Sequence, residues 1–182
     1  VGLMVLKDSG ITSVEQLKGK KVGVLKGGNH HYLAILALEK AGLSFDDVEW
    51  VYPEDAAQGR SIFETKKIDA LASYDPFFAA MESELDTLTF TENVDYQYPN
   101  RTFYFATPDF AKDHADLVDV ILEATDRSDQ WANENKEEVA QIMSKALGID
   151  EQIIQKQINR RTFGATKITQ DIIDTQQRQA DV

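Results

Sequence analysis

Residues 21–42, KVGVLKGGNHHYLAILALEKAG, decide the fold of this chain. They open on an apolar run of strand length, Lys21 to Leu25, and continue through the glycine-rich residues 27–29, which favour a turn. Apolar residues then recur at helical spacing from Tyr32 to Ala41, and Gly42 follows where glycine commonly ends a helix. The stretch therefore predicts a strand, a turn and a helix in succession.

The same alternation of strand and helix surrounds this unit. In the first short helix, Thr12 and Glu15 have the spacing of a capping box, and Gly19 closes the segment. Alternating strands and helices predict an α/β fold with a mostly parallel sheet. The expected elements are a strand over Gly2 to Leu6, a helix over Ile11 to Leu17, a strand over Val48 to Tyr52, a helix from about Asp55 to Lys67 and a strand over Ile68 to Ala72.

Beyond Asn93 the pattern changes to one of helices. One more strand is predicted over Thr102 to Thr107, where apolar and polar residues alternate. The residues after it recur at helical spacing and predict four helices. Their markers are Leu117, Ile121, Ala124, Ser128 and Trp131 for the first, Val139, Ile142, Met143 and Ala146 before Gly148 for the second, Ile153, Ile154 and Ile158 for the third, and Thr169 as the cap of the fourth.

Composition excludes several classes of protein. The 182 residues suffice for one compact domain or two small lobes, and no apolar run approaches the roughly 20 residues of a membrane-spanning helix. Nineteen Lys and Arg against 31 Asp and Glu give a net charge of -12, which repels phosphate backbones and disfavours nucleic acid as a partner. Without cysteine, disulfides, thiolate nucleophiles and Cys-ligated zinc are excluded.

The double glycine before the helix is a candidate anion site. Gly27 and Gly28 let a ligand approach the backbone closely, and the N–H groups at the start of the helix favour a negative charge. An ordinary strand-to-helix turn explains the same residues, and the spacing fits neither dinucleotide nor P-loop motifs. His30 and His31 are adjacent and point about 100° apart on a helix, so a shared metal ion is disfavoured relative to polar contacts with a ligand or water.

Two other segments contain candidate ligand-binding residues. Tyr74 follows a predicted strand, at the edge where open α/β sheets bind ligands, although a core tyrosine explains it equally well. Asp75 before Pro76 reads as a helix N-cap with proline at the first helical position. Arg101 offers a planar cation suited to an oxyanion, against the simpler reading of a surface salt bridge. No catalytic motif is recognised, and no cofactor or metal is predicted.

Four segments of the chain are similar to one protein family. They are residues 7–43 (KDSGITSVEQLKGKKVGVLKGGNHHYLAILALEKAGL), 66–82 (KKIDALASYDPFFAAME), 100–114 (NRTFYFATPDFAKDH) and 160–181 (RRTFGATKITQDIIDTQQRQAD). In this order they resemble the solute-binding proteins of ABC transporters for aliphatic sulfonates, in the wider group that also serves nitrate and taurine. The resemblance implies a periplasmic-binding-protein-like (type II) clamp of two lobes, which are joined by two crossover strands.

The resemblance also implies a domain organisation. Residues 11–93 are expected to form one complete α/β lobe, and residues 1–10 and 94–182 to form the crossover strands and the helical part of the other, incomplete lobe, which is the first lobe of the clamp. Gly2 to Leu6 and Thr102 to Thr107 are the expected crossover strands. The chain opens without methionine and stops inside a helical pattern, so we expect a truncated sequence with any signal peptide or lipid attachment site upstream.

The ligand-binding residues implied by the resemblance lie in three motifs. The loop over Gly27, Gly28, Asn29, His30, His31 and Tyr32 matches the anion loop of the family, Tyr74 and Asp75 match its aromatic-Asp-Pro motif, and Arg101 matches the arginine of its second crossover. The family more often has serine and a small residue after the loop glycine and tryptophan before Asp-Pro. These departures leave donors in the cleft but change its shape, which allows a different sulfonate or another small oxyanion.

The implied function is capture of a small sulfonate for import, with no catalysis. The expected partners are the anionic ligand and the permease of an ABC importer, and the protein is expected to be a monomer. The expected location is extracytoplasmic, in the periplasm or as a cell-surface lipoprotein in a Gram-positive cell, with a role in sulfur acquisition. The alternatives are an enzyme on the same fold, of the pyrimidine- or menaquinone-pathway type, and a sensory ligand-binding domain.

Overall fold

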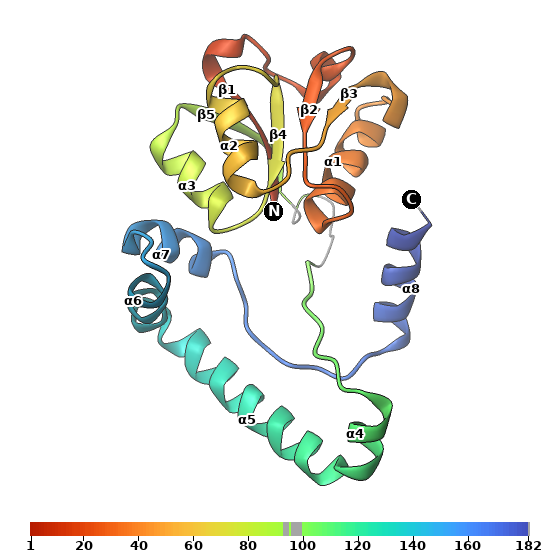
Figure 1. Ribbon diagram of the computed structural model, residues 1–182, viewed down its shortest axis with the longest axis vertical. Helices are drawn as coiled ribbons and strands as arrows, with labels where there is room; N and C mark the ends of the chain where they lie inside the picture. The colour runs from red at the N-terminus through yellow and green to blue at the C-terminus, as the bar shows by residue number, and fades with distance from the viewer. Residues whose placement is uncertain (93–94, 96–99, 182) are drawn as a thin grey trace. The chain divides into compact units, whose positions relative to one another are not determined.

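The computed structural model describes residues 1–92, 95 and 100–181. The chain divides into two compact units, Val1–Asn100 and Arg101–Val182. All the strands of the described residues belong to the first unit, and the second unit is built of helices (Figure 1). Each unit has its own core and is described by itself below.

The first unit alternates strands with helices, as the sequence predicts. The first helix, α1 (Asn29–Lys40), starts three residues earlier than expected, and the last strand, β5 (Thr87–Glu92), was not predicted. The strands are β1 (Gly2–Leu6), β2 (Lys21–Gly23), β3 (Glu49–Val51), β4 (Ala70–Ser73) and β5 (Thr87–Glu92). The helices are α1 (Asn29–Lys40), α2 (Ala56–Glu64) and α3 (Phe77–Glu84), with single 3-10 turns over Lys7–Ser9, Val14–Leu17 and Phe45–Asp47.

The five strands form one mixed sheet in the order β3-β2-β4-β1-β5. Strand β2 pairs in parallel with β3 and β4, whereas β1 runs antiparallel to both of its neighbours, β4 and β5. Four strands therefore share one direction and β1 alone is reversed. The carboxyl ends of β2 and β4 consequently lie at the same edge of the sheet, which is where an open α/β sheet binds ligands.

Both faces of the sheet are covered by helices, and the side chains of β1 show how. Leu3 and Val5 pack into one hydrophobic cluster with Ala34 and Leu38 of α1. Met4, which points to the opposite face, packs with residues of α2 and α3 in a second cluster. Neighbouring strand residues alternate between faces, so one buried strand contributes to two cores. The continuous apolar run GLMVL in β1 follows from this double burial.

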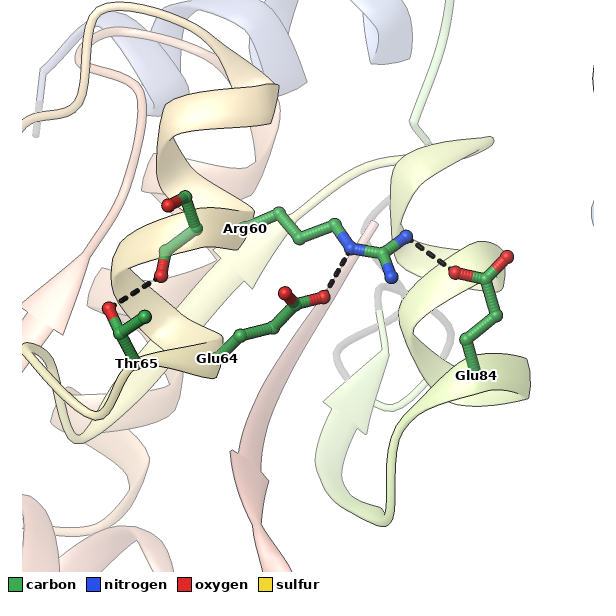
Figure 2. Close-up of polar contacts among 5 residues, drawn as sticks. Arg60, Glu64, Thr65 and Glu84 are labelled. Carbon is green, nitrogen blue, oxygen red and sulfur yellow. Dashed lines mark hydrogen bonds and ion pairs between the residues drawn. The ribbon is translucent and has the colours of Figure 1, made fainter.

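A polar network joins the two helices on one face of the sheet. The Nε of Arg60, on α2, donates to Oε1 of Glu64 at 2.5 Å, and its Nη1 donates to Oε2 of Glu84, on α3, at 2.6 Å (Figure 2). At the end of α2, the hydroxyl of Thr65 donates to the carbonyl of Ser61 at 2.7 Å. The guanidinium therefore connects two helices that are consecutive along the chain.

The predicted capping box is displaced by one residue. The turn starts at Val14 with Ser13 as its N-cap, and Oε1 of Gln16 accepts the backbone N–H groups of Thr12 and Ser13 at 2.7 and 3.2 Å. Glu15 does not serve this role, because the box pairs the cap with the third residue after it, and the cap is Ser13 rather than Thr12. The segment is a single 3-10 turn rather than an α-helix.

The second unit contains the four predicted helices and one helix that was not predicted, α4 (Pro108–Asp113). The predicted helices are α5 (Ala115–Glu134), α6 (Lys136–Leu147), α7 (Glu151–Asn159) and α8 (Gln170–Ala180). Its core joins the end of α5 to α6 and α7 through Ala132, Val139, Ala140, Ile154 and Ile158. The side chain of Asn133 fixes the segment after α7, since its amide donates to the Phe163 carbonyl at 2.8 Å and its oxygen accepts the Phe163 N–H at 2.9 Å. Gly148 ends α6 in a left-handed conformation, and Thr169 is the N-cap of α8.

The prediction of a strand over Thr102 to Thr107 is wrong. These residues have no regular secondary structure, and Tyr104 and Phe105 are 66% and 91% exposed. An alternating pattern forms a strand only when a neighbouring strand accepts its hydrogen bonds, and no strand of the described residues pairs with this segment.

The two units do not divide the chain as the predicted lobes do at its N-terminus. Strand β1 is hydrogen-bonded to β4 and β5, and it therefore lies within the first unit, whereas the prediction grouped residues 1–10 with residues 94–182. The predicted boundary between residues 93 and 94 lies outside the described residues, and the lobe assignment itself stays a prediction. Among the described helices, none combines the length and the apolar character that a membrane span requires.

Candidate functional site

The candidate site is built on the connection between β2 and α1. Gly27 has a φ of +80°, in the left-handed region that a residue with a Cβ rarely adopts. Gly28 follows as the N-cap of α1, with a φ of -84° and a ψ of 168°. Because glycine has no side chain, the cap does not cover the positive end of the helix. The sequence thus places a turn, an uncovered helix start and two glycines within one short segment.

His30 is buried directly against Gly28. Only 6% of this histidine is exposed, and its ring also packs on the ring of Tyr74, with centroids 5.1 Å apart. A Cβ added to Gly28 would lie 2.3 Å from Cε1 of His30 and 2.8 Å from its Nδ1. The second glycine is therefore required by the close contact with the imidazole, and not by its backbone conformation.

The imidazole of His30 is neutral near pH 7. Burial is the main cause that lowers its pKa from 6.5 to about 4, and the charge of neighbouring His31 acts in the same direction. The ring makes a hydrogen bond to the Leu25 carbonyl, whereas Nε2 is buried without any hydrogen-bond partner in the described part of the chain. An unpaired buried nitrogen is costly, and it marks a position where a ligand or water is expected.

A small cavity adjoins this histidine. Its volume is about 10 Å³, enough for about one water molecule. Its lining includes Leu25 after β2, Ser73 at the end of β4, Tyr74 beyond it and Asp55 at the start of α2. The cavity therefore lies at the carboxyl ends of two parallel strands. Asp55 and Ser73 were not identified from the sequence, although Ser73 directly follows the predicted strand Ile68 to Ala72 and adjoins Tyr74.

His31 has different surroundings from its neighbour. Its Nδ1 accepts the backbone N–H of Gly27 at 3.2 Å, and its ring contacts Trp50 and Tyr52 edge-on, with centroids 5.1 and 5.8 Å apart. Burial, and then the charge of Lys26, lower its pKa. His31 thus stabilises the glycine turn from within an aromatic group, and its Nε2 is buried without a partner among the described residues.

The remaining residues of the loop and of the Asp-Pro motif mainly support the helices. The amide of Asn29 donates to Oδ1 of Asn100, and the N–H of Tyr32 donates to the Gly28 carbonyl at 3.3 Å. The N-cap of α3 is Pro76, and not Asp75 as predicted. The Oδ1 of Asp75 nevertheless accepts the N–H of Ala79 at 3.1 Å. The carboxylate therefore still accepts a hydrogen bond from the first turn of α3, although Asp75 lies one residue before the N-cap and not at it.

Arg101 belongs to the second unit. Its side chain is about one-third exposed, and its guanidinium lies 4.0 Å from the carboxylate of Asp171, which is 80% exposed. A pair at this distance between solvent-exposed groups contributes little to stability. Among the predicted site residues, the structure brings together Gly28, His30 and Tyr74 in the first unit. Within the described residues, no group of three or more His, Asp or Glu side chains is arranged to hold a metal ion.

The sequence assigns this α/β fold to a family. The chain belongs to the NMT1/THI5-like family, whose model matches residues 1–139. A candidate aliphatic sulfonates-binding protein of Escherichia coli strain K12 is 27% identical over 183 residues, a match that covers 99% of this chain and 56% of that relative. The chain thus spans little more than half the length of this relative.

Solved structures give the same fold. The periplasmic aliphatic sulphonate binding protein SsuA from Escherichia coli matches with a TM-score of 0.89 at 26% identity, over 99% of this chain and 58% of that one. The desulfurization enzyme DSZB matches with a TM-score of 0.68 at 16% identity, over 99% of this chain and 67% of that one, a likeness of fold alone. The predicted α/β fold of the periplasmic-binding-protein type and the predicted resemblance to aliphatic sulfonate-binding proteins are confirmed.

Proposed function

We propose that the protein is the solute-binding component of an ABC importer and that it captures a small organic sulfonate or a similar oxyanion. One observation carries the proposal: the helix start at Gly28, which has no side-chain cap, lies against the buried His30, whose ring packs on Tyr74. A helix start attracts an anion through its backbone N–H groups and its dipole. The 27% identity to a sulfonate-binding relative over 99% of the chain supports the choice of anion.

The proposed ligand-binding residues fall into two chemical groups. The backbone of the loop offers N–H donors to the anionic head, and Arg101 offers a permanently charged, planar fork that suits an oxyanion. The aromatic ring of Tyr74 and the imidazole of His30 shape the floor beside the loop. The full set is Gly27, Gly28, Asn29, His30, His31, Tyr32, Tyr74, Asp75 and Arg101.

The proposed mechanism is binding without chemistry. Donors held by a rigid helix start bind the anion, and ligand binding favours a closed form that the permease of the importer recognises. The net charge of -12 opposes long-range attraction of an anion, so the affinity must come from short-range donors at the site. No bond is made or broken, and no cofactor takes part.

We further propose the cellular setting that this function requires. The protein would act outside the cytoplasm as a monomer, in the periplasm or as a lipoprotein on the cell surface, and would deliver its ligand to a membrane permease for sulfur acquisition. Nucleic acid is not a partner, because a chain with 31 acidic and 19 basic residues repels phosphate backbones.

An enzymatic role is less well supported by the side chains of the first unit. The chain has no cysteine, so a thiolate nucleophile is excluded. Nε2 of His30 and Nε2 of His31 have no hydrogen-bond partner in the described part of the chain, whereas a catalytic histidine is usually held between a nucleophile and an orienting carboxylate. These histidines are arranged to pack and to bind.

Isothermal titration calorimetry of the complete gene product that contains residues 1–182 tests the proposal. Ethanesulfonate and longer alkanesulfonates should bind with measurable heat, whereas sulfate and nitrate provide comparison anions of similar charge. A folded protein that gives neither heat nor a thermal shift with any sulfonate contradicts the proposed function.

A further inference from the structure

The two ring nitrogens of His30 are in different situations, and this difference fixes the tautomer. The ring donates a hydrogen bond to the Leu25 carbonyl, and Nε2 has no partner in the described part of the chain. The bond to Leu25 therefore involves Nδ1, which must carry the proton because a carbonyl can only accept. Nε2 of the neutral ring is left as a hydrogen-bond acceptor.

The cavity beside His30 is surrounded by further acceptors. Asp55, which carries a carboxylate, and Ser73, which carries a hydroxyl, line it together with His30. One oxygen of Asp55 already accepts the N–H of Gln58 at 2.7 Å, so the side chain is held in place. A second anionic oxygen would meet a negative charge and a nitrogen lone pair there, and both would repel it.

The size of the cavity limits what can enter it. A volume of about 10 Å³ accommodates one group of the size of a water molecule, such as a hydroxyl or an ammonium. The anionic head of a sulfonate carries three oxygens and does not fit. The head must therefore bind elsewhere on the loop, and the cavity is open only to a single small substituent of the same ligand.

We propose that His30 determines ligand specificity by accepting, at Nε2, a hydrogen bond from one hydroxyl or ammonium group carried by the bound anion. This inference rests on the proposed function and narrows its substrate class to small organic anions with a hydrogen-bond donor. Burial supports it, because the low pKa of His30 keeps the imidazole neutral and able to accept at physiological pH. It also gives a reason for Gly28, since the ring can occupy this position only where no Cβ is present.

The tautomer can be measured directly. In the ligand-free protein, long-range ¹H–¹⁵N NMR of the imidazole should show the proton of His30 on Nδ1 at pH 7. A proton on Nε2 overturns the proposal, because that nitrogen would then be a donor.

Calorimetry with three ligands on the complete gene product tests the recognition itself. Ethanesulfonate, 2-hydroxyethanesulfonate and 2-aminoethanesulfonate share a head group and differ in one substituent, and we expect one of the two substituted ligands to bind about 5- to 10-fold more tightly than ethanesulfonate. The hydroxyl and amine arms show which donor the cavity takes. Equal affinities for all three overturn the inference, since the cavity then holds only water, but leave the proposed function standing. No binding of any of the three overturns both.

Variants separate this role from a structural one. His30→Phe keeps a ring but loses the acceptor, and the affinity ratio between substituted and unsubstituted ligands should fall to about 1. His30→Gln restores an acceptor and should recover part of the ratio. The same change at an exposed histidine of the second unit, His114→Phe, should leave the ratio intact. A ratio that persists in His30→Phe contradicts the proposal.

Discussion

The imidazole of His30 occupies the space where a side chain at Gly28 would begin. The distance from a Cβ at Gly28 to Cε1 of His30 would be only 2.3 Å, well inside van der Waals contact. Both residues belong to the start of α1, and the ring is held in this position by burial and by Tyr74. The glycine and the histidine are therefore two parts of one feature, and each constrains what the other can be.

Two glycine-to-alanine substitutions in the first unit should have opposite effects. Gly28→Ala should lower the free energy of unfolding by about 1–3 kcal/mol, because the buried ring must shift to admit the methyl group. Gly59→Ala should be neutral or stabilising by about 0.5–1 kcal/mol, because Gly59 lies within α2 and its Cβ would make ordinary contact with Pro53 at 3.4 Å. Urea unfolding of both variants measures the difference.

The loss in Gly28→Ala should depend on the histidine. In a His30→Ala background, the same glycine substitution should cost much less, because the atom that it meets is gone. A double-mutant cycle that shows additive losses indicates that the ring is not the cause.

Stability should fall as the pH is lowered from 7 to 5. The pKa of His30 is about 4 in the folded protein and about 6.5 in the unfolded chain, so between these values the unfolded chain binds more protons. The full contribution is present above pH 6.5 and is lost as the pH falls toward 4. Between pH 6.5 and pH 5, a span of about 1.5 pH units, this predicts that the free energy of unfolding falls by about 2 kcal/mol.

Urea unfolding at pH 7 and pH 5 checks this prediction. His31, whose pKa is also lowered, adds a loss in the same direction, whereas Asp47, with a pKa of about 2, loses its contribution only in more acid solution. His30→Gln removes the titrating group and should reduce the pH dependence. An equally steep dependence in this variant assigns it to other groups.

Removing one arm of the Arg60 network should have a small, salt-dependent effect. Glu84→Gln leaves the pair with Glu64 intact and weakens only the connection from α2 to α3, which Figure 2 shows. These side chains are between 31% and 45% exposed, so we expect a loss of at most about 1 kcal/mol. Repeating the unfolding in 1 M salt should shrink the difference from the wild type. An unchanged difference at high salt indicates that packing, and not charge, is lost.

Arg101→Ala should weaken sulfonate binding more than His30→Ala. Loss of a charge-assisted contact costs about 1.5–3 kcal/mol, whereas loss of a neutral hydrogen bond costs about 1 kcal/mol. Calorimetry on folded variants of the complete gene product gives both values. Equal losses, or a larger loss for His30, show that Arg101 serves only its surface pair with Asp171.

Hydrogen exchange should distinguish the two units. Leu3, Met4 and Val5 of β1 are fully buried between two helical layers, so their amides should exchange slowly. The amides of α5 should exchange faster, because Val120 and Ile121 on that helix are 58% and 54% exposed. If the α5 amides outlast those of β1, the two units differ in stability in the opposite sense from the one expected.

Strand and helix positions in the first unit could be predicted because both sheet faces are covered. Full burial makes β1 an unbroken apolar run, and a run of this kind is recognisable without knowing its partners. The segment Thr102 to Thr107 shows the limit of this reasoning. Its alternating pattern is that of a strand, but a strand depends on a neighbour that no local pattern specifies. The unpredicted β5 is a different case, because its sequence TLTFTE does alternate between polar and apolar residues and could have been identified.

The candidate site was only partly predictable. The loop glycines and the helix start are local features, so the sequence indicates them directly. The burial of His30 is not local, since it depends on Tyr74, which lies 44 residues further along the chain. The lining by Asp55 and Ser73 depends in the same way on the order of the strands. What could not be predicted is thus the set of contacts between elements, and these contacts decide which groups remain without a partner.

Strand β1 is made before the other four strands, but it pairs with β4 and β5, which are made last. Val5 pairs with Ala70 on one side and with Leu88 on the other, so both neighbours of this strand emerge from the ribosome long after it. The nascent chain can form α1, β2 and β3 while the apolar run of β1 is still unpaired. Strand β1 can pair with β4 once Ser73 has been made, and its other edge is covered only once Glu92 has been made. Strand β1, the first of the five strands to be synthesised, is therefore among the last to be paired. Its exposed apolar run is the segment that we expect a chaperone to bind during synthesis.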